Sequence, residues 1–162
     1  MFKRIVVCLD GSSLAEKILP YVTEGAVPFS TKVILLRVLD VPSTVAWIEG
    51  TTADTEIVTK ESQRDKKEAE AYLKSIATSM RERDLDVESV VLHRIAPDEA
   101  ILDYASQNHV DIIAMTTHGR SGITRTLMGS IADSVVRQSH LPVLVIHPPE
   151  TADNVQASQN HY

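Results

Sequence analysis

The chain has 162 residues, 43% of them hydrophobic, which fits one folded domain with a real core and excludes a disordered chain. The net charge of −6 excludes a general nucleic-acid binder, and aromatic residues, at 4%, are too scarce for a base-stacking platform. Cys8 is the only cysteine, so no internal disulfide forms. No apolar run approaches the ~20 residues that span a bilayer, and no signal peptide is visible. We expect a cytoplasmic protein without a membrane span.

The first third of the chain reads as strand, helix, strand. Residues 4–9 are rich in β-branched side chains and end at Asp10-Gly11, which predicts a strand and a turn. Ser13-Leu-Ala-Glu16 resembles a capping box and predicts the start of a helix, with a kink at Pro20. Residues 32–38 predict the second strand.

Helical and strand patterns alternate through the rest of the chain. An apolar stripe from Ala69 to Met80 predicts a long helix that starts near Thr55. The remaining patterns predict strands at 87–92, 110–115 and 142–147, and helices at 97–107 and 131–137. We expect residues 1–148 to form one domain and residues 149–162 to be a disordered polar tail.

The alternation of strands and helices predicts an α/β fold, an open doubly wound parallel sheet with helices on both faces. The strands at 4–9 and 110–115 are nearly all apolar, so they should lie centrally. Ligands of such sheets bind beyond the carboxyl ends of the strands, where the strand order reverses. Asp10 and Thr116 close these two strands, so they meet at that crevice if the strands are neighbours.

A glycine-bearing loop joins the strand at 110–115 to the helix at 131–137. Glycine lets the backbone approach a phosphate, and the first N–H groups of a helix lack internal partners. Arg120 and Arg125 add positive charge to this loop. The segment therefore predicts a site for a nucleotide or another phosphorylated ligand.

Other nucleotide-binding and catalytic motifs are absent. The turn after the first strand lacks the G-x-G-x-x-G of a dinucleotide-binding fold, no P-loop occurs, and Ser121 lacks the spacing of a nucleophile elbow. Three polar residues keep two interpretations. Asp10 is either a turn residue or a ligand contact, His118 either a loop residue or a functional side chain, and Ser130 either a helix N-cap or a phosphate contact.

The motifs resemble the universal stress protein family in its small single-domain form, over roughly residues 3–148. The matching segments are Lys3–Asp10, Ser13–Tyr21, Pro97–Leu102, Asp111–Gly122, Leu127–Ser130 and Pro142–Ile146. The ATP-binding branch of that family carries G-x-x-G, nine residues, then G-[ST]. Gly119 and Gly129-Ser130 match the second part of the pattern, and Thr116 stands in place of the first glycine.

The resemblance implies an adenine nucleotide alpha hydrolase-like fold with strand order 3-2-1-4-5. It also implies bound ATP or AMP, with Mg²⁺ or Mn²⁺ on the phosphates. By position, the base and ribose would contact Cys8, Leu9, Asp10 and Val38. The ribose-phosphate side would comprise Met115, Thr116, His118, Gly119, Gly129, Ser130 and Ile131. We add the neighbouring residues Arg120, because of its positive charge, and Ser121, because of its hydroxyl, to the predicted site.

The last strand, at 142–147, should lie at the edge of the sheet. Pairing it antiparallel with its own copy satisfies its unpaired backbone groups and buries Val143 and Val145, which predicts a homodimer. The leading hypothesis is a nucleotide-binding stress-response sensor or switch that also contacts an unknown regulatory protein. A nucleotide-free interaction dimer of the same fold is the alternative. No residue is predicted to be catalytic or to hold a metal, although a slow ATPase is a third hypothesis.

Overall fold

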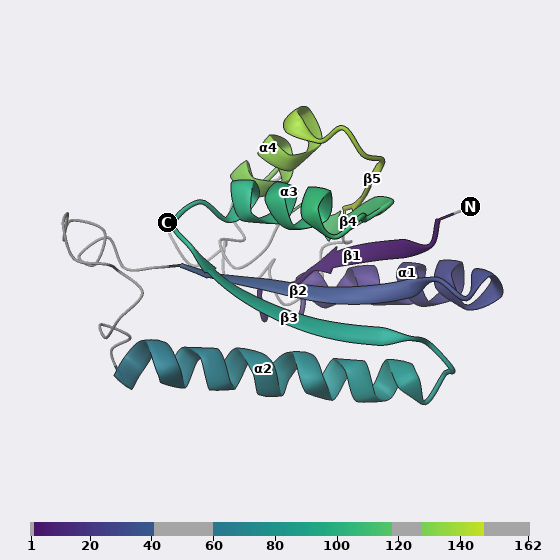
Figure 1. Cartoon of the computed structure of the whole chain (residues 1–162), viewed down its shortest axis with the longest axis horizontal. Coiled ribbons are helices and arrows are strands. Elements are labelled where there is room, and N and C mark those ends of the chain that lie inside the picture. Colours follow the sequence, from purple (N-terminus) through teal and green to yellow (C-terminus); the bar gives the residue numbers. More distant parts are fainter. Residues whose placement is uncertain (1, 41–59, 118–127, 148–162) are drawn as a thin grey trace, which may run out of the picture.

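The computed structural model describes residues 2–40, 60–117 and 128–147. Five strands form one parallel sheet in the order β3-β2-β1-β4-β5, as predicted. Helices cover both faces (Figure 1). The elements run β1 (Arg4–Cys8), a 3₁₀ turn η1 (Ala15–Ile18), α1 (Leu19–Ala26), a 3₁₀ turn η2 (Val27–Phe29), β2 (Lys32–Asp40), α2 (Lys60–Arg81), β3 (Val87–Arg94), α3 (Pro97–Gln107), β4 (Ile112–Thr116), α4 (Ser130–Gln138) and β5 (Val143–Ile146).

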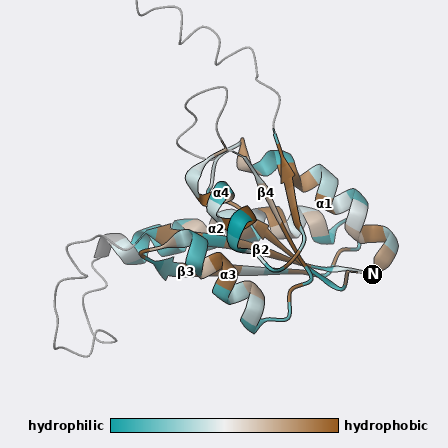
Figure 2. Ribbon diagram, turned by 90° about the horizontal axis from the view of Figure 1, so that it is seen from above, coloured by the Kyte–Doolittle hydropathy of each residue, from teal (hydrophilic) through white to brown (hydrophobic). Residues whose placement is uncertain are grey.

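The strands divide the hydrophobic core into two layers. Val7 and Leu35 pack with Leu73 in the layer under α1 and α2. Val6 and Ile113 pack with Val135 in the layer under α3 and α4. Successive side chains of a strand point to opposite faces, so a strand covered by helices on both faces must be apolar throughout. Figure 2 shows this as brown strands between helices that carry hydrophilic residues.

The central position predicted for the first and fourth strands is confirmed. β1 lies between β2 and β4, with Val6 beside both Ile34 and Ile113. The carboxyl ends of β1 and β4 therefore meet at the same edge of the sheet, which brings Asp10 close to Thr116. The strand order reverses here, because the chain runs from β1 outward to β3 and then returns to β4.

The start of the first helical segment differs from the prediction. Ser13 makes no capping bond; instead Ser12 Oγ accepts the N–H of Ala15 at 3.1 Å. A 3₁₀ turn occupies residues 15–18, and α1 begins at Leu19. Pro20 thus lies in the first turn of α1 and not inside a longer helix, which is where a missing N–H costs least.

Two other predicted features differ in detail. The first described residue of α2 is Lys60, and the predicted start near Thr55 lies outside the described residues. In β5, Val143 and Val145 already pack against the α3–α4 layer of their own chain, while Leu144 is on the opposite face. Dimerisation is therefore not what buries these valines. No helix in the described ranges has the length and apolarity needed to cross a membrane.

Candidate functional site

A pocket of about 340 Å³ lies at the carboxyl ends of β1, β2 and β4. Its walls are formed by the residues that follow β1, by the last residues of β2, and by the first turns of α3 and α4. Its lining residues are Cys8, Leu9, Asp10, Ala15, Leu36, Val38, Leu39, Asp40, Pro97, Ile101, Met115, Thr116, Thr117, Gly129, Ser130, Ile131 and Ala132. The position is the crevice at which open α/β sheets bind ligands.

The predicted site residues within the described ranges all line this one pocket. They are Cys8, Leu9, Asp10, Val38, Met115, Thr116, Gly129, Ser130 and Ile131. The other four predicted residues, His118, Gly119, Arg120 and Ser121, lie outside the described residues. The parallel topology explains the grouping, because three strands deliver their carboxyl ends to the same side.

Asp10 shapes the turn that follows β1. Its Oδ1 atom accepts the backbone N–H of Ser12 at 2.9 Å and the hydroxyl of Ser12 at 2.7 Å. The turn reverses direction through Gly11, whose φ of +89° lies in the left-handed region that favours glycine. Asp10 is therefore a turn residue, as one interpretation of the sequence predicted, and its side chain also lines the pocket.

Backbone contacts join the two ends of the loop between β4 and α4. The N–H of Gly129 donates to the carbonyl of Thr117 at 2.6 Å, and the N–H of Thr117 donates to Ile146 at 2.9 Å. Thr117 Oγ1 also hydrogen-bonds Nδ1 of His147 at 2.9 Å. Thr117 and Gly129, which both line the pocket, are thus held together.

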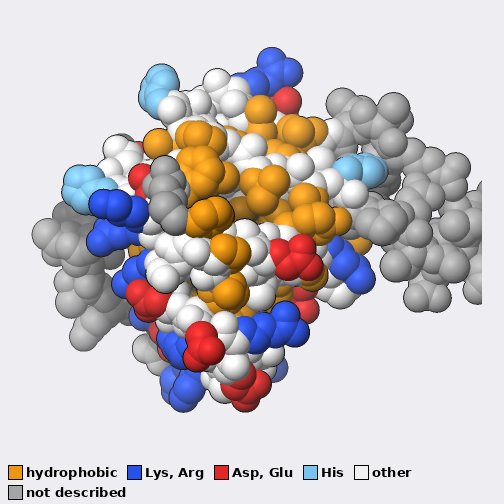
Figure 3. Space-filling model, turned by 90° about the vertical axis from the view of Figure 1, so that its right-hand side faces the viewer, with side chains coloured by type: hydrophobic (Ala, Val, Ile, Leu, Met, Phe, Trp, Pro, Cys, Tyr) orange, Lys and Arg blue, Asp and Glu red, His pale blue; other side chains and the backbone are white. Residues whose placement is uncertain are grey.

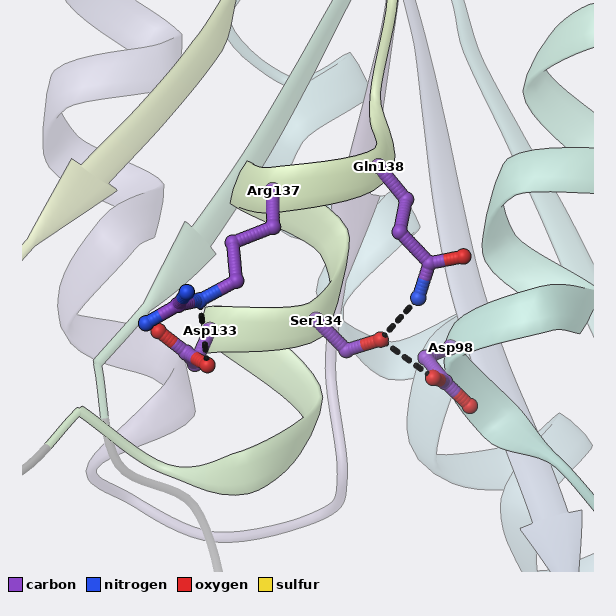
Figure 4. Close-up of polar contacts among 5 residues, drawn as sticks. All are labelled: Asp98, Asp133, Ser134, Arg137 and Gln138. Atoms are coloured by element: carbon purple, nitrogen blue, oxygen red, sulfur yellow. Dashed lines mark hydrogen bonds and ion pairs between the residues drawn. The ribbon is translucent and has the colours of Figure 1, made fainter.

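The first turn of α4 faces the pocket without a side-chain cap. Gly129 is the N-cap residue and Ser130 the first helical residue, so of the two interpretations of Ser130 the helix N-cap is wrong. Asp133, in the first turn of α4, pairs with Arg137 at 2.8 Å (Figure 4). An N-cap without an acceptor leaves the first N–H groups of the helix without a side-chain partner. These groups favour an anion at this end of α4.

A polar cluster joins the two helices that flank the pocket (Figure 4). Ser134 of α4 donates its hydroxyl to Asp98 Oδ2 in the first turn of α3, and Gln138 Nε2 donates to Ser134 Oγ at 2.6 Å. The Ser134 hydroxyl, more than any other group, holds the pKa of Asp98 below its usual range. The contact fixes the spacing of α3 and α4, which contribute Ile101 and Ile131 to the pocket walls.

Cys8 lines the pocket but is a poor nucleophile. Burial raises the pKa of its thiol to about 12, so the thiolate is scarce near neutral pH. The residue as a whole is partly exposed because it borders the open pocket, yet surrounding protein atoms desolvate the sulfur. In this environment Cys8 behaves as a small apolar residue of the pocket wall.

Sequence reasoning missed part of the pocket wall. Asp40, Pro97 and Ile101 line it together with Ala15, Leu36, Leu39, Thr117 and Ala132. Two of these residues carried a usable signal: Asp40 follows a predicted strand and Pro97 opens a predicted helix, both at the carboxyl side of the sheet. The others depend on how the helices approach the strands, which the pattern of one sequence does not specify.

The described lining residues include two carboxylates, Asp10 and Asp40, and no basic side chain. Within residues 2–40, 60–117 and 128–147, no three His, Cys, Asp or Glu side chains gather as a metal site. Asp10 and Asp40 are therefore the carboxylates that the described lining residues offer to a cation.

The universal stress protein family model matches residues 1–147, so the chain belongs to the universal stress protein family. Universal stress protein MJ0531 of Methanocaldococcus jannaschii is 29% identical over 151 residues, which cover 93% of this chain and 85% of that protein.

Solved structures show the same fold. The structure of MJ0577, also from Methanocaldococcus jannaschii, matches with a TM-score of 0.78 and 27% identity, and the match covers 93% of this chain and 99% of that one. A universal stress protein family member from Arabidopsis thaliana, solved with AMP bound, matches with a TM-score of 0.61 and 16% identity over 94% of each chain.

Proposed function

We propose that the pocket binds ATP or AMP and that the protein acts as a cytoplasmic stress-response sensor or switch. One observation carries the proposal: the pocket opens directly onto the uncapped first turn of α4 at the reversal point of the sheet. A phosphate binds favourably at such a turn, and the reversal point is where doubly wound folds hold nucleotides. The pocket volume of about 340 Å³ lies within the range of small-molecule sites. AMP bound to the Arabidopsis family member adds support.

The two ends of the pocket suit the two ends of a nucleotide. Apolar side chains of Leu36, Val38 and Ile101 form a surface for a base, and the Asp10 carboxylate can accept a ribose hydroxyl. Ser130 and the N–H groups of α4 form the phosphate end. Asp10 and Asp40 repel bare phosphates, so we expect the nucleotide to bind with Mg²⁺ or Mn²⁺, which neutralises this repulsion. The proposal assigns no catalytic residue.

We also propose that the protein works as a homodimer. β5 pairs with β4 on one side, and among the described strands none pairs with its other side. Antiparallel pairing with the β5 of a second copy satisfies these backbone groups. A regulatory protein partner would then recognise the nucleotide-bound dimer.

A second function, a nucleotide-free interaction dimer, is favoured by one observation. Thr116, which replaces the first motif glycine, is only 7% exposed at the end of β4, and its side chain occupies space in the pocket wall. The two functions differ in whether the pocket takes adenine nucleotide at all.

Thermal unfolding with and without nucleotide tests the proposal. ATP with Mg²⁺ at about 100 times its Kd should stabilise the protein by about 2.7 kcal/mol, which is roughly 5–10 °C in Tm for a chain of this size. CTP with Mg²⁺ carries the same phosphates and should shift Tm less, because it lacks the purine. An unchanged Tm up to millimolar ATP, with no nucleotide in gently purified protein, would support the nucleotide-free dimer instead.

A further inference from the structure

An apolar groove of about 640 Å³ lies at the opposite end of the sheet from the nucleotide pocket, on the side of α1. We call it the amino-end groove; its walls include Phe2, Ile5, Tyr21, Phe29, Ile112 and Leu144. Its three aromatic lining residues are exposed, by 46% for Phe2, 57% for Tyr21 and 54% for Phe29. Figure 3 shows hydrophobic side chains gathered across this face. Exposed apolar patches of this kind mark interaction surfaces.

Hydrogen bonds between side chains and the backbone hold the groove in place. The buried hydroxyl of Thr31 donates to the carbonyl of Phe2 at 2.9 Å. The next residue is fixed as well, because the N–H of Lys3 donates to Asp111 Oδ2 at 2.7 Å. Phe2 therefore presents its ring from a fixed backbone. The hydroxyls of Thr31 and Tyr21 are the only polar side-chain groups among the described lining residues, so the groove offers few acceptors for the N–H groups of an occupant.

The chain itself carries a segment of matching chemistry. Pro148-Pro149 follows β5 after one residue, and its ring nitrogens carry no N–H that burial would leave unsatisfied. Proline pairs dock into aromatic-lined grooves because their extended backbone is already ordered. No charged side chain is among the described residues that line the groove, which agrees with an uncharged occupant.

We propose that the amino-end groove receives Pro148-Pro149 of a second copy of this chain. The inference rests on the homodimer of the proposed function, in which the two β5 strands run antiparallel. That arrangement places the carboxyl end of the partner's strand beside the amino end of β5, where Leu144 borders the groove. The partner's two prolines then emerge next to the rings of Phe2 and Tyr21.

The topology favours the partner's prolines over those of the same chain. A chain's own Pro148-Pro149 starts at the carboxyl end of its β5, about 13 Å along a four-residue strand from the groove. When the two β5 strands pair antiparallel, the carboxyl end of the partner's β5 lies beside the groove, so its prolines do not have to span this distance of about 13 Å. The interface area argues the same way, because four-residue strands alone bury far less than the ~800 Å² per partner of a stable interface. Docked prolines enlarge the contact on both sides of the two-fold axis.

Disulfide trapping in the full-length protein tests the proposal. Gly25 lines the groove and has open space where a Cβ would lie, so Gly25→Cys introduces a thiol without crowding. Glu150→Cys places the second thiol next to the prolines and keeps both of them. When the two single variants, distinguished by mass, are mixed and oxidised, a disulfide-linked heterodimer is expected. Ile95→Cys is the matched control, because Ile95 is 67% exposed at the other end of the sheet.

The dimer dissociation constant is the second measurement. Tyr21→Ser removes an aromatic wall of the groove and should weaken the dimer at least about tenfold, as loss of a buried interface ring does. Val27 is 48% exposed and lies near the groove in the sequence but does not line it. Val27→Ser should therefore change the dimer dissociation constant less than about threefold.

The outcomes separate this inference from the dimer itself. A heterodimer with Gly25→Cys but not with Ile95→Cys, together with the weaker Tyr21→Ser dimer, supports the proposal. A stable dimer that gives no cross-link and tolerates Tyr21→Ser overturns the groove assignment alone. A disulfide only within single chains of the Gly25→Cys/Glu150→Cys variant also overturns it. A wild-type monomer at tens of micromolar overturns both the groove assignment and the homodimer.

Discussion

The guanidinium of Arg37 lies over the ring of Tyr72, with Cζ 5.3 Å from the ring centroid. This contact joins β2 to α2. Burial raises the pKa of the Tyr72 hydroxyl, and Glu16 makes a smaller contribution in the same direction. The same guanidinium fills the space beside Gly11, where an added Cβ would meet it at 3.0 Å. The turn that carries Asp10 into the pocket is therefore packed against a cation that α2 holds in place.

Gly11→Ala should destabilise the fold by about 1–2 kcal/mol and weaken nucleotide binding. The φ of +89° disfavours any side chain, and the added methyl displaces Arg37. Gly25→Ala is the matched control, because its Cβ meets open space in α1 and helix propensity predicts a gain of roughly 0.5–1 kcal/mol. Urea unfolding of both variants provides the comparison. Equal stability of Gly11→Ala and wild type would contradict this account of the turn.

Gly129→Val should abolish nucleotide binding and leave the fold intact. Gly129 has φ −56° and ψ 147°, a conformation that valine adopts readily, so backbone strain gives no reason for glycine here. The position of Gly129 in the pocket wall at the start of α4 gives another reason, since a branched side chain there would fill the proposed phosphate position. Isothermal titration with ATP and circular dichroism measure the two effects separately. Binding at wild-type affinity would show that the phosphates lie elsewhere.

The sequence predicted the parts of the site that depend on topology. Alternating strands and helices, with the order that the family resemblance implied, were enough to bring Asp10 and Thr116 to one crevice. The parts that depend on side-chain approach were not predicted. Ser12 and not Ser13 makes the capping bond, and Ser134 bonds to Asp98, 36 residues away in the sequence. Both contacts depend on how the helices pack against the sheet, which the sequence pattern does not specify.

Thr116→Gly should keep or improve affinity for ATP. The substitution restores the first glycine of the family pattern and removes a buried β-branched side chain from the pocket wall. It should also lower stability by roughly 1 kcal/mol, because glycine loses more conformational freedom on folding. Thr116→Ser, which keeps the hydroxyl, is the control. Titration with a fluorescent ATP analogue decides the role of Thr116, and weaker binding by the glycine variant would mean that the side chain serves the ligand.

Ser134→Ala should lower stability at neutral pH by about 1 kcal/mol, the usual net worth of a hydrogen bond. The Ser134 hydroxyl lowers the pKa of Asp98 in the folded state below its ordinary value of 3.8. A lowered folded pKa stabilises the protein above the unfolded pKa, and this stability is lost as pH falls through the folded value. The difference between wild type and variant should therefore shrink below about pH 4. Ser106→Ala, at an exposed site on α3, is the control. A difference that persists unchanged at pH 2 would contradict the assignment.

Proline substitutions in β5 should separate the dimer edge from the sheet of one chain. The carbonyl of Pro142 accepts the N–H of Ile113 in β4, and the carbonyl of Ile146 accepts the N–H of Thr117, the residue after β4. Even-numbered residues of β5 therefore bond to β4, and odd-numbered ones present their backbone groups outward. Val145→Pro removes an outward donor and should give a folded monomer, since proline is tolerated at a strand edge. Its Tm should fall by less than that of Leu144→Pro, because only the packing of the Val145 side chain in the α3–α4 layer is lost. Leu144→Pro removes a donor to β4 and should destabilise the fold by about 3 kcal/mol or more. Analytical ultracentrifugation with thermal unfolding measures both effects, and a Val145→Pro dimer as tight as the wild type would place the interface elsewhere.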